Sequence, residues 1–307
     1  MRYNIIFKTG LILSIILFSG LFGCKKETEI IYPSDTEFNN EIKVNILGYK
    51  SDAMEPFISK DEKYLFFNNL KGDNGKDLFY AEKVDDTTFV FKGEIQGVNT
   101  TYVDGNPAMD SSYNFYFIST RNLDTGNKTL FAGKFENGTV TNLQEVQGTI
   151  NIPDLYWINM GVEISEDGNT MYVSNAKFNA GENFPNKGNI RFAVKENGEF
   201  NIPDNESYIL QNINTDVSVE YAGELSANGL ELFFSQLTLS DPPVFKLLYS
   251  SRKNIDEPFG VPVSITAPFK NNVNAFVEAP TLSKDGKRLY YHKLENDTFS
   301  IFMLSRY

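Results

Sequence analysis

The chain consists mainly of short apolar runs separated by polar turn sequences, and five of these runs follow one pattern. In each copy an apolar run ends at a residue, here called the anchor, that precedes a polar turn and a second apolar run. The anchors are Ser59, Asp110, Ser165, Ser226 and Ser283, spaced 51, 55, 61 and 57 residues apart. A period of this size is typical of arrays built from four-stranded units. We call the copies repeats one to five.

Each repeat predicts four strands, A to D, with strand A ending at the anchor. An Asp-Gly or Asn-Gly pair follows the anchor in repeats three to five and predicts a tight hairpin to strand B. Repeats one and two have Asp61-Glu62 and Ser112-Tyr113 there, so we expect their turns to differ. Strand B is predicted at 64–67, 115–118, 171–173, 232–234 and 289–291, and strand C at 78–80, 129–131, 190–192, 247–249 and 301–303. Strand D is predicted at 93–97, 143–148, 208–213 and 261–266.

Repeat five shows no strand D before Tyr307, and residues 42–47 precede repeat one as the other D strands precede their next repeats. We therefore expect 42–47 to complete the last unit, because pairing the first strand with the last sheet removes exposed edges. The predicted fold is all-β, a five-bladed β-propeller of four-stranded blades closed by an N-terminal strand. Six blades is the alternative, although it needs a repeat with no visible pattern.

One repeat carries a family resemblance. The stretch Ser283 to Tyr291, followed by an Ile-Phe strand, resembles the TolB-type repeat, a relative of WD repeats, and the likeness covers roughly residues 42–307. The family usually has proline after the serine, where this chain has Lys60, Glu166, Ala227 and Lys284. The resemblance implies a propeller in the cell envelope that commonly serves as a binding or scaffolding platform. It implies no shared catalytic residues.

The N-terminus predicts export and lipidation. Residues 1–23 have a basic start and an apolar stretch, as in a signal peptide. The sequence Leu21-Phe22-Gly23-Cys24 resembles the bacterial lipobox, which implies that Cys24 is lipidated; a chance cysteine behind an ordinary signal peptide is the alternative. Residues 24–41 then form a lipid anchor and flexible tether, and 42–307 the propeller. Lys25 argues against retention in the inner membrane, so we expect an outer-membrane lipoprotein.

Composition excludes several classes of function. Cys24 is the only cysteine and His292 the only histidine, which removes disulfides, thiol catalysis, serine triads and histidine-rich metal sites. The net charge is −12, and about −14 without the signal peptide, which disfavours nucleic acid as a partner. No phosphate loop or calcium-loop spacing occurs, so no cofactor and no metal are predicted. We interpret His292 as a partly buried strand residue.

Carboxylates are the remaining candidates for chemistry. The loops that lead into strand A are expected to open on one rim of the propeller channel, and they carry Asp52, Glu55, Asp104, Glu220, Glu224 and Glu278, with Asn159 in repeat three. Converging carboxylates can cleave glycosides or hold a hard cation. The alternative is that they are solvated or pair with the bases that follow strand C. Those bases are Lys83, Lys134, Lys195, Arg252 and Arg306.

Aromatic residues occupy the same loops. Tyr102, Trp157, Tyr221 and Phe276 stand beside the acids, and aromatics among acids and amides on a concave rim suit sugar rings or extended peptides. The alternative is that they plug the spaces between blades. Insertions at 175–189 and 237–243 exceed the blade minimum and mark further candidate binding loops.

The leading hypothesis is a non-enzymatic envelope lipoprotein, attached to the membrane by its lipid, whose rim binds a protein or a glycan. A glycoside-processing enzyme that uses the rim carboxylates is the alternative. A third hypothesis is a scaffold that contacts its partner through the side of the propeller.

Overall fold

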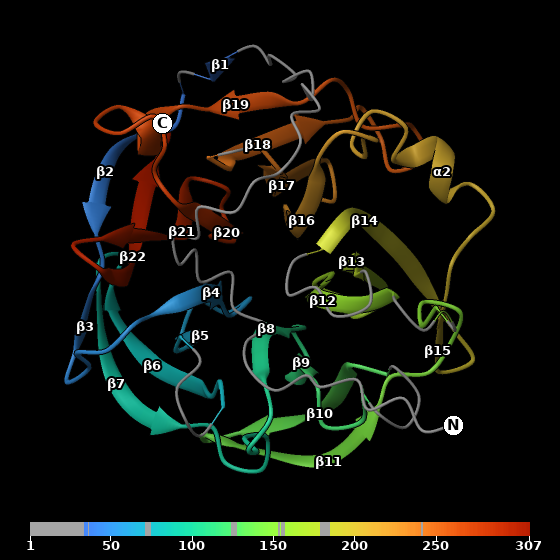
Figure 1. Ribbon diagram of the computed structural model, residues 1–307. Coiled ribbons are helices and arrows are strands. Elements are labelled where there is room, and N and C mark those ends of the chain that lie inside the picture. Colours follow the sequence, from blue (N-terminus) through green and yellow to red (C-terminus); the bar gives the residue numbers. More distant parts are fainter. Residues whose placement is uncertain are drawn as a thin grey trace, which may run out of the picture.

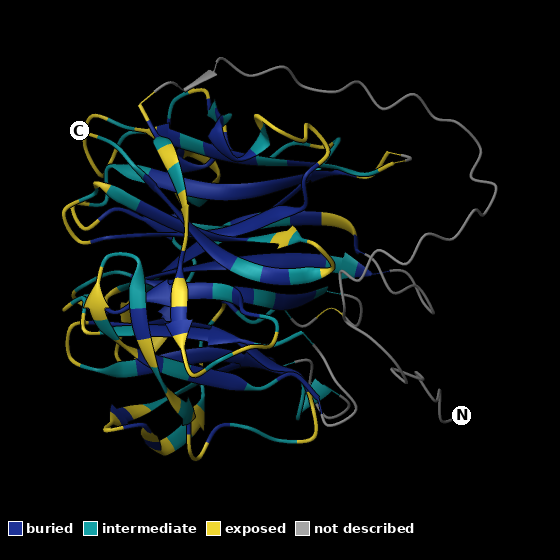
Figure 2. Ribbon diagram, turned by 90° about the vertical axis from the view of Figure 1, so that its left-hand side faces the viewer, coloured by how far each residue is buried: buried dark blue, intermediate teal, exposed yellow. Residues whose placement is uncertain are grey.

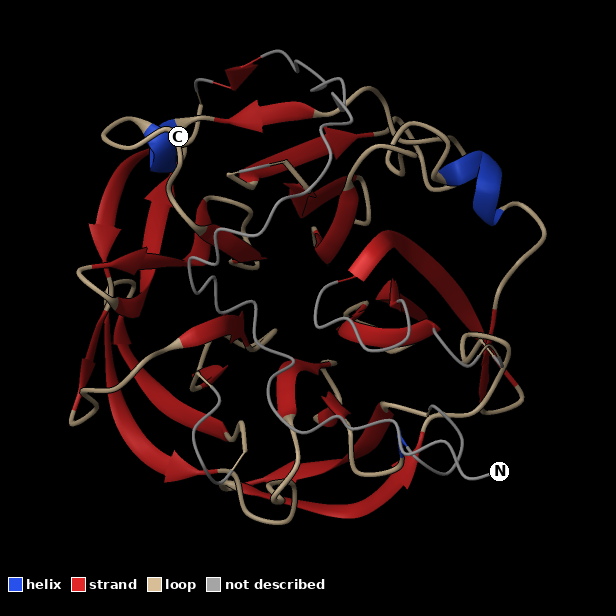
Figure 3. Ribbon diagram, viewed as in Figure 1, coloured by secondary structure: helices blue, strands red, loops and turns tan. Residues whose placement is uncertain are grey.

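The structure, a computed structural model, describes residues 34–35, 37–70, 75–123, 128–152, 154, 157–178, 185–240 and 242–307. Strands make up 57% of the chain, and the helical elements that lie wholly within the described ranges are short, namely α2 (Glu206–Ile209) and the 3-10 turn η1 (Ala267–Phe269) (Figure 3). The predicted signal peptide and Cys24 lie outside the described residues. Within the described ranges no helix has the length and apolar character needed to cross a membrane.

The predicted A, B and C strands are present in all five repeats. Strand A is β4 (Met54–Ile58), β8 (Asp104–Met109), β12 (Trp157–Ile164), β16 (Val219–Leu225) and β20 (Val277–Leu282). Strand B is β5 (Tyr64–Asn68), β9 (Asn114–Ser119), β13 (Thr170–Phe178), β17 (Glu231–Thr238) and β21 (Arg288–Glu295). Strand C is β6 (Leu78–Asp85), β10 (Leu130–Glu136), β14 (Pro185–Glu196), β18 (Val244–Ser251) and β22 (Thr298–Ser305).

The repeats surround a common axis, with their A strands innermost and later strands progressively further out (Figure 1). Within each repeat, neighbouring strands pair antiparallel. The hydrogen-bonded sheets do not coincide with five separate units, however. Repeats three and four form one nine-stranded sheet, because a single parallel bridge between Gly188 and Val219 joins β14 to β16.

The D strands differ most from the prediction. They are β7 (Thr88–Glu94), β11 (Thr139–Glu145), β15 (Glu199–Asn201) and β19 (Val263–Ile265). The predicted strand at 208–213 is wrong. The Asn197-Gly198 turn, with φ of 52° and 88°, returns the chain onto β14 at once, and the chain then enters α2, whose Ile209 is buried.

The predicted N-terminal strand, 42–47, is divided between two sheets. The segment β2 (Asn39–Lys43) pairs antiparallel with β22, and β3 (Asn45–Leu47) pairs parallel with β7 of repeat one. A shorter segment, β1 (Ser34–Asp35), pairs parallel with β19. The chain before repeat one therefore contacts strands of repeats one, four and five.

The anchor residues organise the turn between strands A and B. Ser283 Oγ bonds to Asp285 Oδ1 at 2.7 Å and accepts the N–H of Arg288 at 2.9 Å, and Ser59, Ser165 and Ser226 make the same pair of bonds. Asp110 replaces the hydroxyl with its carboxylate, which accepts the N–H groups of Ser112 and Asn114, each at 2.9 Å. This explains the recurring Ser-x-Asp/Asn pattern.

The expectation that the turns of repeats one and two differ is wrong. Glu62 and Tyr113 adopt φ of 57° and 61°, the left-handed conformation that Gly168, Gly229 and Gly286 have in the other repeats. In all five turns this residue donates its N–H to the anchor carbonyl, at 2.7 to 3.0 Å. The bonds made by the anchor therefore impose a backbone that ordinarily favours glycine.

Buried apolar residues fill the spaces between neighbouring repeats (Figure 2). Phe66 of repeat one contacts Phe115 and Phe135 of repeat two, with ring centroids 5.2 and 5.0 Å apart. Each buried phenylalanine stabilises the fold by about 1.5–3 kcal/mol. Packing between repeats, rather than within one sheet, holds the A strands in place around the axis.

Candidate functional site

Every strand A is interrupted by a bulge just before its anchor. The register shifts there in β4, β8, β12, β16 and β20. Four bulges contain a non-glycine residue with positive φ: Glu55 (49°), Asn106 (51°), Ala222 (49°) and Ala279 (54°). A left-handed residue of this kind costs about 1–3 kcal/mol and persists only where surrounding contacts impose it.

Those contacts come from strand B of the preceding repeat. The bulge N–H of Asn106 donates to Asn68, that of Ala222 to Ser174 and that of Ala279 to Ser235, at 3.2, 2.6 and 2.9 Å. The N–H of Glu55, in repeat one, donates to Nδ1 of His292, in repeat five, at 3.1 Å. The four acceptors stand nine residues after their anchors.

His292 is therefore one member of a recurring set. It is 0% exposed rather than partly buried, because its ring is enclosed between repeats five and one. Nδ1 of His292 accepts the Glu55 bond, and Nε2 lies 3.3 Å from Oε2 of Glu278 without a hydrogen bond.

The predicted rim carboxylates are held by partners inside the protein. Glu55 contacts Lys76 Nζ with both oxygens, at 2.6 and 2.7 Å, and its Oε2 also accepts from Asn106 Nδ2 at 3.0 Å. The Glu55 and Lys76 side chains are 16% and 10% exposed, so most of this ion pair is removed from water. The ion pair lies within repeat one, and the bond from Asn106 links Glu55 to repeat two.

Partners inside the protein also hold the carboxylates of Asp52, Asp104 and Glu220. Asp52 accepts the N–H of Phe299 at 2.8 Å. Asp104 is fully buried, binds Arg121 Nη2 at 2.7 Å and accepts from Thr100. Glu220, also fully buried, accepts from Thr215, Ser218 and Gln236, and burial raises its pKa.

Glu278 joins Tyr221 and His292 into one polar chain. The Tyr221 hydroxyl donates to Glu278 Oε1, and burial together with the Glu278 charge raises the pKa of Tyr221 well above its ordinary value. Both side chains line the channel between repeats four and five. This arrangement orders the channel wall and leaves Tyr221 a neutral donor.

The bases after strand C do not pair with these acids. Four of the five bind the turns between strands A and B instead: Lys134 donates to the carbonyl of Ser112, Arg252 to that of Gly229 and Arg306 to that of Gly286. Lys83 binds the Glu62 carboxylate at 2.7 Å. The alternative interpretation, that rim acids pair with these bases, is therefore wrong, because the two groups lie at opposite ends of the strands.

The candidate aromatics and Asn159 serve different roles. Tyr102 is 50% exposed. Trp157, at the start of β12, is partly exposed and has Lys177 Nζ 5.9 Å from its ring centroid. Phe276 is buried and stacked on Phe245 at 4.3 Å, and buried Asn159 bonds to Asn175 at 3.0 Å. Of the rim candidates, Glu55, Glu220, Tyr221 and Glu278 line a common cavity.

Cavities follow one another along the axis. The first, at the predicted rim, has a volume of about 90 Å³. It shares Glu55, Asn106 and Ser174 with a second cavity of about 30 Å³, here called the inner cavity. The second shares Tyr172 and Glu224 with a third of about 710 Å³ at the face formed by the turns between strands A and B. We call this third cavity the turn-face depression.

The turn-face depression is the one of these three with the volume of a ligand site, which is typically about 300–1,000 Å³. The residue after each anchor lines it, namely Lys60, Ser111, Glu166, Ala227 and Lys284. Lys284 of repeat five reaches Glu166 of repeat three at 2.6 Å. Its apolar wall includes Tyr172, Phe192, Ile209 and Leu225, which belong to the cluster between repeats three and four.

Three ionisable groups lie where the depression meets the inner cavity. Lys60 Nζ is 2.7 Å from Glu163 Oε1 and 3.8 Å from Glu224 Oε1. The Glu163 and Glu224 side chains are 2% and 5% exposed. Burial and the neighbouring Glu163 charge raise the pKa of Glu224 well above its ordinary value, whereas the two carboxylates raise that of Lys60 against the effect of burial.

The candidates expected in the loops before strand A include Glu224 but neither Glu163 nor its partner Lys60. The signal of this cluster is nevertheless visible in the sequence. The repeats depart from the usual proline at four positions, and the residues there all line the depression: Lys60, Glu166, Ala227 and Lys284. The residue after each anchor varies between repeats although the turn around it is constant, and the side chains at this position converge around the axis.

The sequence matches no protein-family model and no curated protein. Solved structures similar to this chain include the catalytic domain of a GH62 α-L-arabinofuranosidase from Coprinopsis cinerea, at TM-score 0.51 and 14% identity, covering 89% of this chain and 98% of that one. Another is a putative exo-β-1,3-galactanase from Bifidobacterium bifidum, at TM-score 0.52 and 10% identity, covering 88% and 92%. At this identity the likeness shows the β-propeller fold alone.

TolB from Acinetobacter baumannii is also similar, at TM-score 0.47 and 13% identity. The match covers 83% of this chain and 55% of the TolB chain, so this chain corresponds to about half of TolB. This TM-score carries no argument about function.

Proposed function

We propose that this protein is a non-enzymatic recognition module of the bacterial envelope, anchored through a lipid on Cys24. Its propeller binds a partner protein or glycan at one end of its axis. The proposal rests on what the channel residues do in the structure. The rim carboxylates, which could otherwise act on a substrate, form hydrogen bonds or ion pairs with other groups of the protein.

The observation that carries the proposal is the state of the rim carboxylates. Asp52, Glu55, Asp104, Glu220 and Glu278 all have hydrogen-bond or ion-pair partners within the protein. A glycosidase needs an acid and a second carboxylate that both face a bound sugar. A cavity of about 90 Å³ at these residues is well below the volume of a ligand pocket. Both features favour a structural role for the acids.

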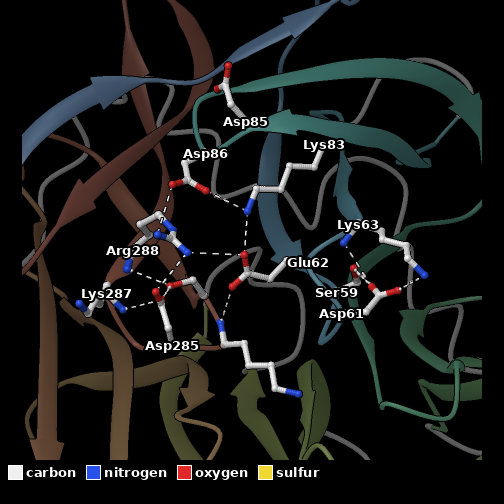
Figure 4. A network of polar contacts seen from close by, with 12 residues as sticks. Ser59, Asp61, Glu62, Lys63, Lys83, Asp85, Asp86, Asp285, Lys287 and Arg288 are labelled. Carbon is white, nitrogen blue, oxygen red and sulfur yellow. Dashed lines mark hydrogen bonds and ion pairs between the residues drawn. The ribbon is translucent and has the colours of Figure 1, made fainter.

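We also propose that the fold is a five-bladed ring closed between repeats five and one. Three contacts support closure: the pairing of β2 with β22, the bond from Glu55 to His292, and a charged network on the turn face. In this network Glu62 of repeat one lies between Lys83, at 2.7 Å, and Arg288 of repeat five, at 3.5 Å (Figure 4). Arg288 also reaches Asp86 at 3.2 Å.

Chemical crosslinking and co-purification from intact envelopes test the recognition role, run beside a glycan-binding screen and an assay on aryl glycosides. We expect a specific captured partner, or a bound glycan that is recovered intact. Turnover of a glycoside that is abolished by both Glu55→Gln and Glu278→Gln would contradict the proposal and favour the enzyme.

The anchor is tested separately. Replacement Cys24→Ala is expected to move the protein from the membrane fraction to the soluble fraction, because one lipidated residue is its predicted membrane attachment. Membrane association that is unchanged in this variant would contradict the lipoprotein assignment without affecting the recognition role.

A further inference from the structure

The turn-face depression has an unbalanced charge at its floor. Glu163 and Glu224 face a single ammonium, that of Lys60. Two other carboxylates nearby already have cations of their own: Glu55 is paired with Lys76, and Glu166 is paired with Lys284. Two carboxylates with one cation leave an excess negative charge in a place shielded from water, where an uncompensated charge is costly.

An unpaired atom points to the same deficit. Glu163 Oε2 is buried and has no hydrogen-bond partner. Glu163 lines the inner cavity and Glu224 lines both this cavity and the depression. In the free protein a proton shared between the two carboxyl groups can compensate the charge, which agrees with the raised pKa of Glu224. A ligand cation would replace that proton.

The wall above this floor is apolar. Tyr172 and Leu225 are buried and Phe192 is 6% exposed, and Val194 and Ile255 extend the surface outward. Apart from the floor residues, the depression is lined by three acidic and two basic side chains, so this charge also favours a cation over an anion. An apolar wall that leads to a carboxylate suits a flexible hydrocarbon stem with a cationic head.

We propose that the turn-face depression binds an arginine or lysine side chain of a partner protein, with its cationic head on Glu224 and Glu163. The stem of this side chain packs on Tyr172, Phe192 and Leu225. Lys60 then keeps its bond to Glu163, and two cations face two carboxylates. This inference rests on the proposed recognition role and names the ligand class.

A divalent metal ion is a weaker candidate for this place. The residues that the structure describes contain no group of three or more acidic, histidine or cysteine side chains arranged to hold a metal. An ammonium or guanidinium needs only the two carboxylates, and its apolar stem makes use of the wall that a metal ion would leave empty.

The test uses N-acetylarginine methylamide as the probe and N-acetylcitrulline methylamide as its neutral isostere, with binding followed by NMR titration of the full propeller. We expect saturable binding of the arginine probe, at least tenfold tighter than that of the citrulline probe. Glu224→Gln and Glu163→Gln should each weaken the arginine probe at least fivefold. The matched control, Glu199→Gln on the exposed strand β15, should leave it unchanged.

Lys60→Met is expected to change the affinity for the arginine probe in the opposite direction. It removes the competing cation, so the arginine probe should bind at least threefold tighter, which a merely destabilised variant would not show. Equal binding of both probes, or binding of the arginine probe that is unaffected by Glu224→Gln and Glu163→Gln, would overturn the proposed ligand.

The co-purification experiment separates this inference from the recognition role. A partner captured equally by the parent and by Glu224→Gln would overturn the cation site and leave the recognition role standing. A glycan bound in the depression and lost in Glu224→Gln, with no difference between the arginine and citrulline probes, would likewise overturn the ligand class alone.

Discussion

The backbone N–H of Glu55 donates a hydrogen bond of 3.1 Å to Nδ1 of His292, which lies 237 residues later in the chain. The two residues belong to the first and last repeats, and the same bond recurs between repeats one and two, three and four, and four and five with Asn68, Ser174 and Ser235 as acceptors. The single histidine of the chain thus serves as a structural acceptor.

Replacement His292→Leu should lower the free energy of unfolding by about 1–3 kcal/mol, because it leaves the partly buried N–H of Glu55 without its acceptor. Chemical denaturation measures this. Replacement His292→Asn should recover at least half of the loss, since an asparagine accepts the equivalent bond at Asn68. Equal losses for both variants would contradict the acceptor role.

The anchor turns predict a smaller effect at Ser283. Replacement Ser283→Ala removes the acceptor for the N–H of Arg288 and should cost about 1 kcal/mol in the unfolding free energy. Ser300, a partly exposed serine of β22, provides the control, and Ser300→Ala should stay within about 0.5 kcal/mol of the parent. A loss at position 300 as large as that at 283 would show that the anchor bonds add no stability.

The repeats themselves were predictable, because anchor, turn and strands recur in the same order around Ser59, Asp110, Ser165, Ser226 and Ser283. Glu62 and Tyr113 could not be placed correctly from turn propensity, since the bonds made by the anchor hold them in a conformation that favours glycine. The role of rim acids such as Glu55 depended on Lys76, which stands 21 residues later in the same repeat and approaches Glu55 only once β4, β5 and β6 have paired. The convergence of Lys60, Glu163 and Glu224 required the axial geometry.

Backbone strain predicts a stabilising change in the β21–β22 hairpin. Asn296 and exposed Asp297 both have positive φ, at 51° and 62°. Replacement Asp297→Gly gives the Asn-Gly pair that this turn prefers and should raise stability by about 0.5–1 kcal/mol. Asp297→Ala keeps the strain and should give no gain in the denaturation midpoint; a gain equal to that of glycine would refute the explanation.

Asp77 predicts a pH dependence. Burial, followed by the charges of Glu94 and Asp104, raises its pKa from 3.8 to about 6. The unfolded chain therefore releases this proton first as pH rises, so the carboxyl contributes a loss of stability that develops between about pH 4 and pH 6. Replacement Asp77→Asn removes that loss.

The expected gain of Asp77→Asn over the parent is present at pH 7 and absent at pH 3.5. It stays below about 1 kcal/mol, because Asp77 is only partly buried and solvent screens its charge. Denaturant midpoints of both proteins at the two pH values measure the difference. A gain of equal size at both would exclude titration of Asp77 as its cause.

The central claim is that the channel carboxylates hold the propeller together, and Glu55 provides its most direct test. Replacing a residue that serves binding or catalysis commonly leaves the protein as stable or more stable. Replacing one partner of a buried ion pair lowers stability, because the other charge stays buried and unpaired. The decisive measurement is the unfolding free energy of Glu55→Gln against the parent. We predict a loss of about 3 kcal/mol, because Lys76 is left as an unpaired buried cation. A variant as stable as the parent or more stable would contradict the account and return Glu55 to the candidates for a functional carboxylate.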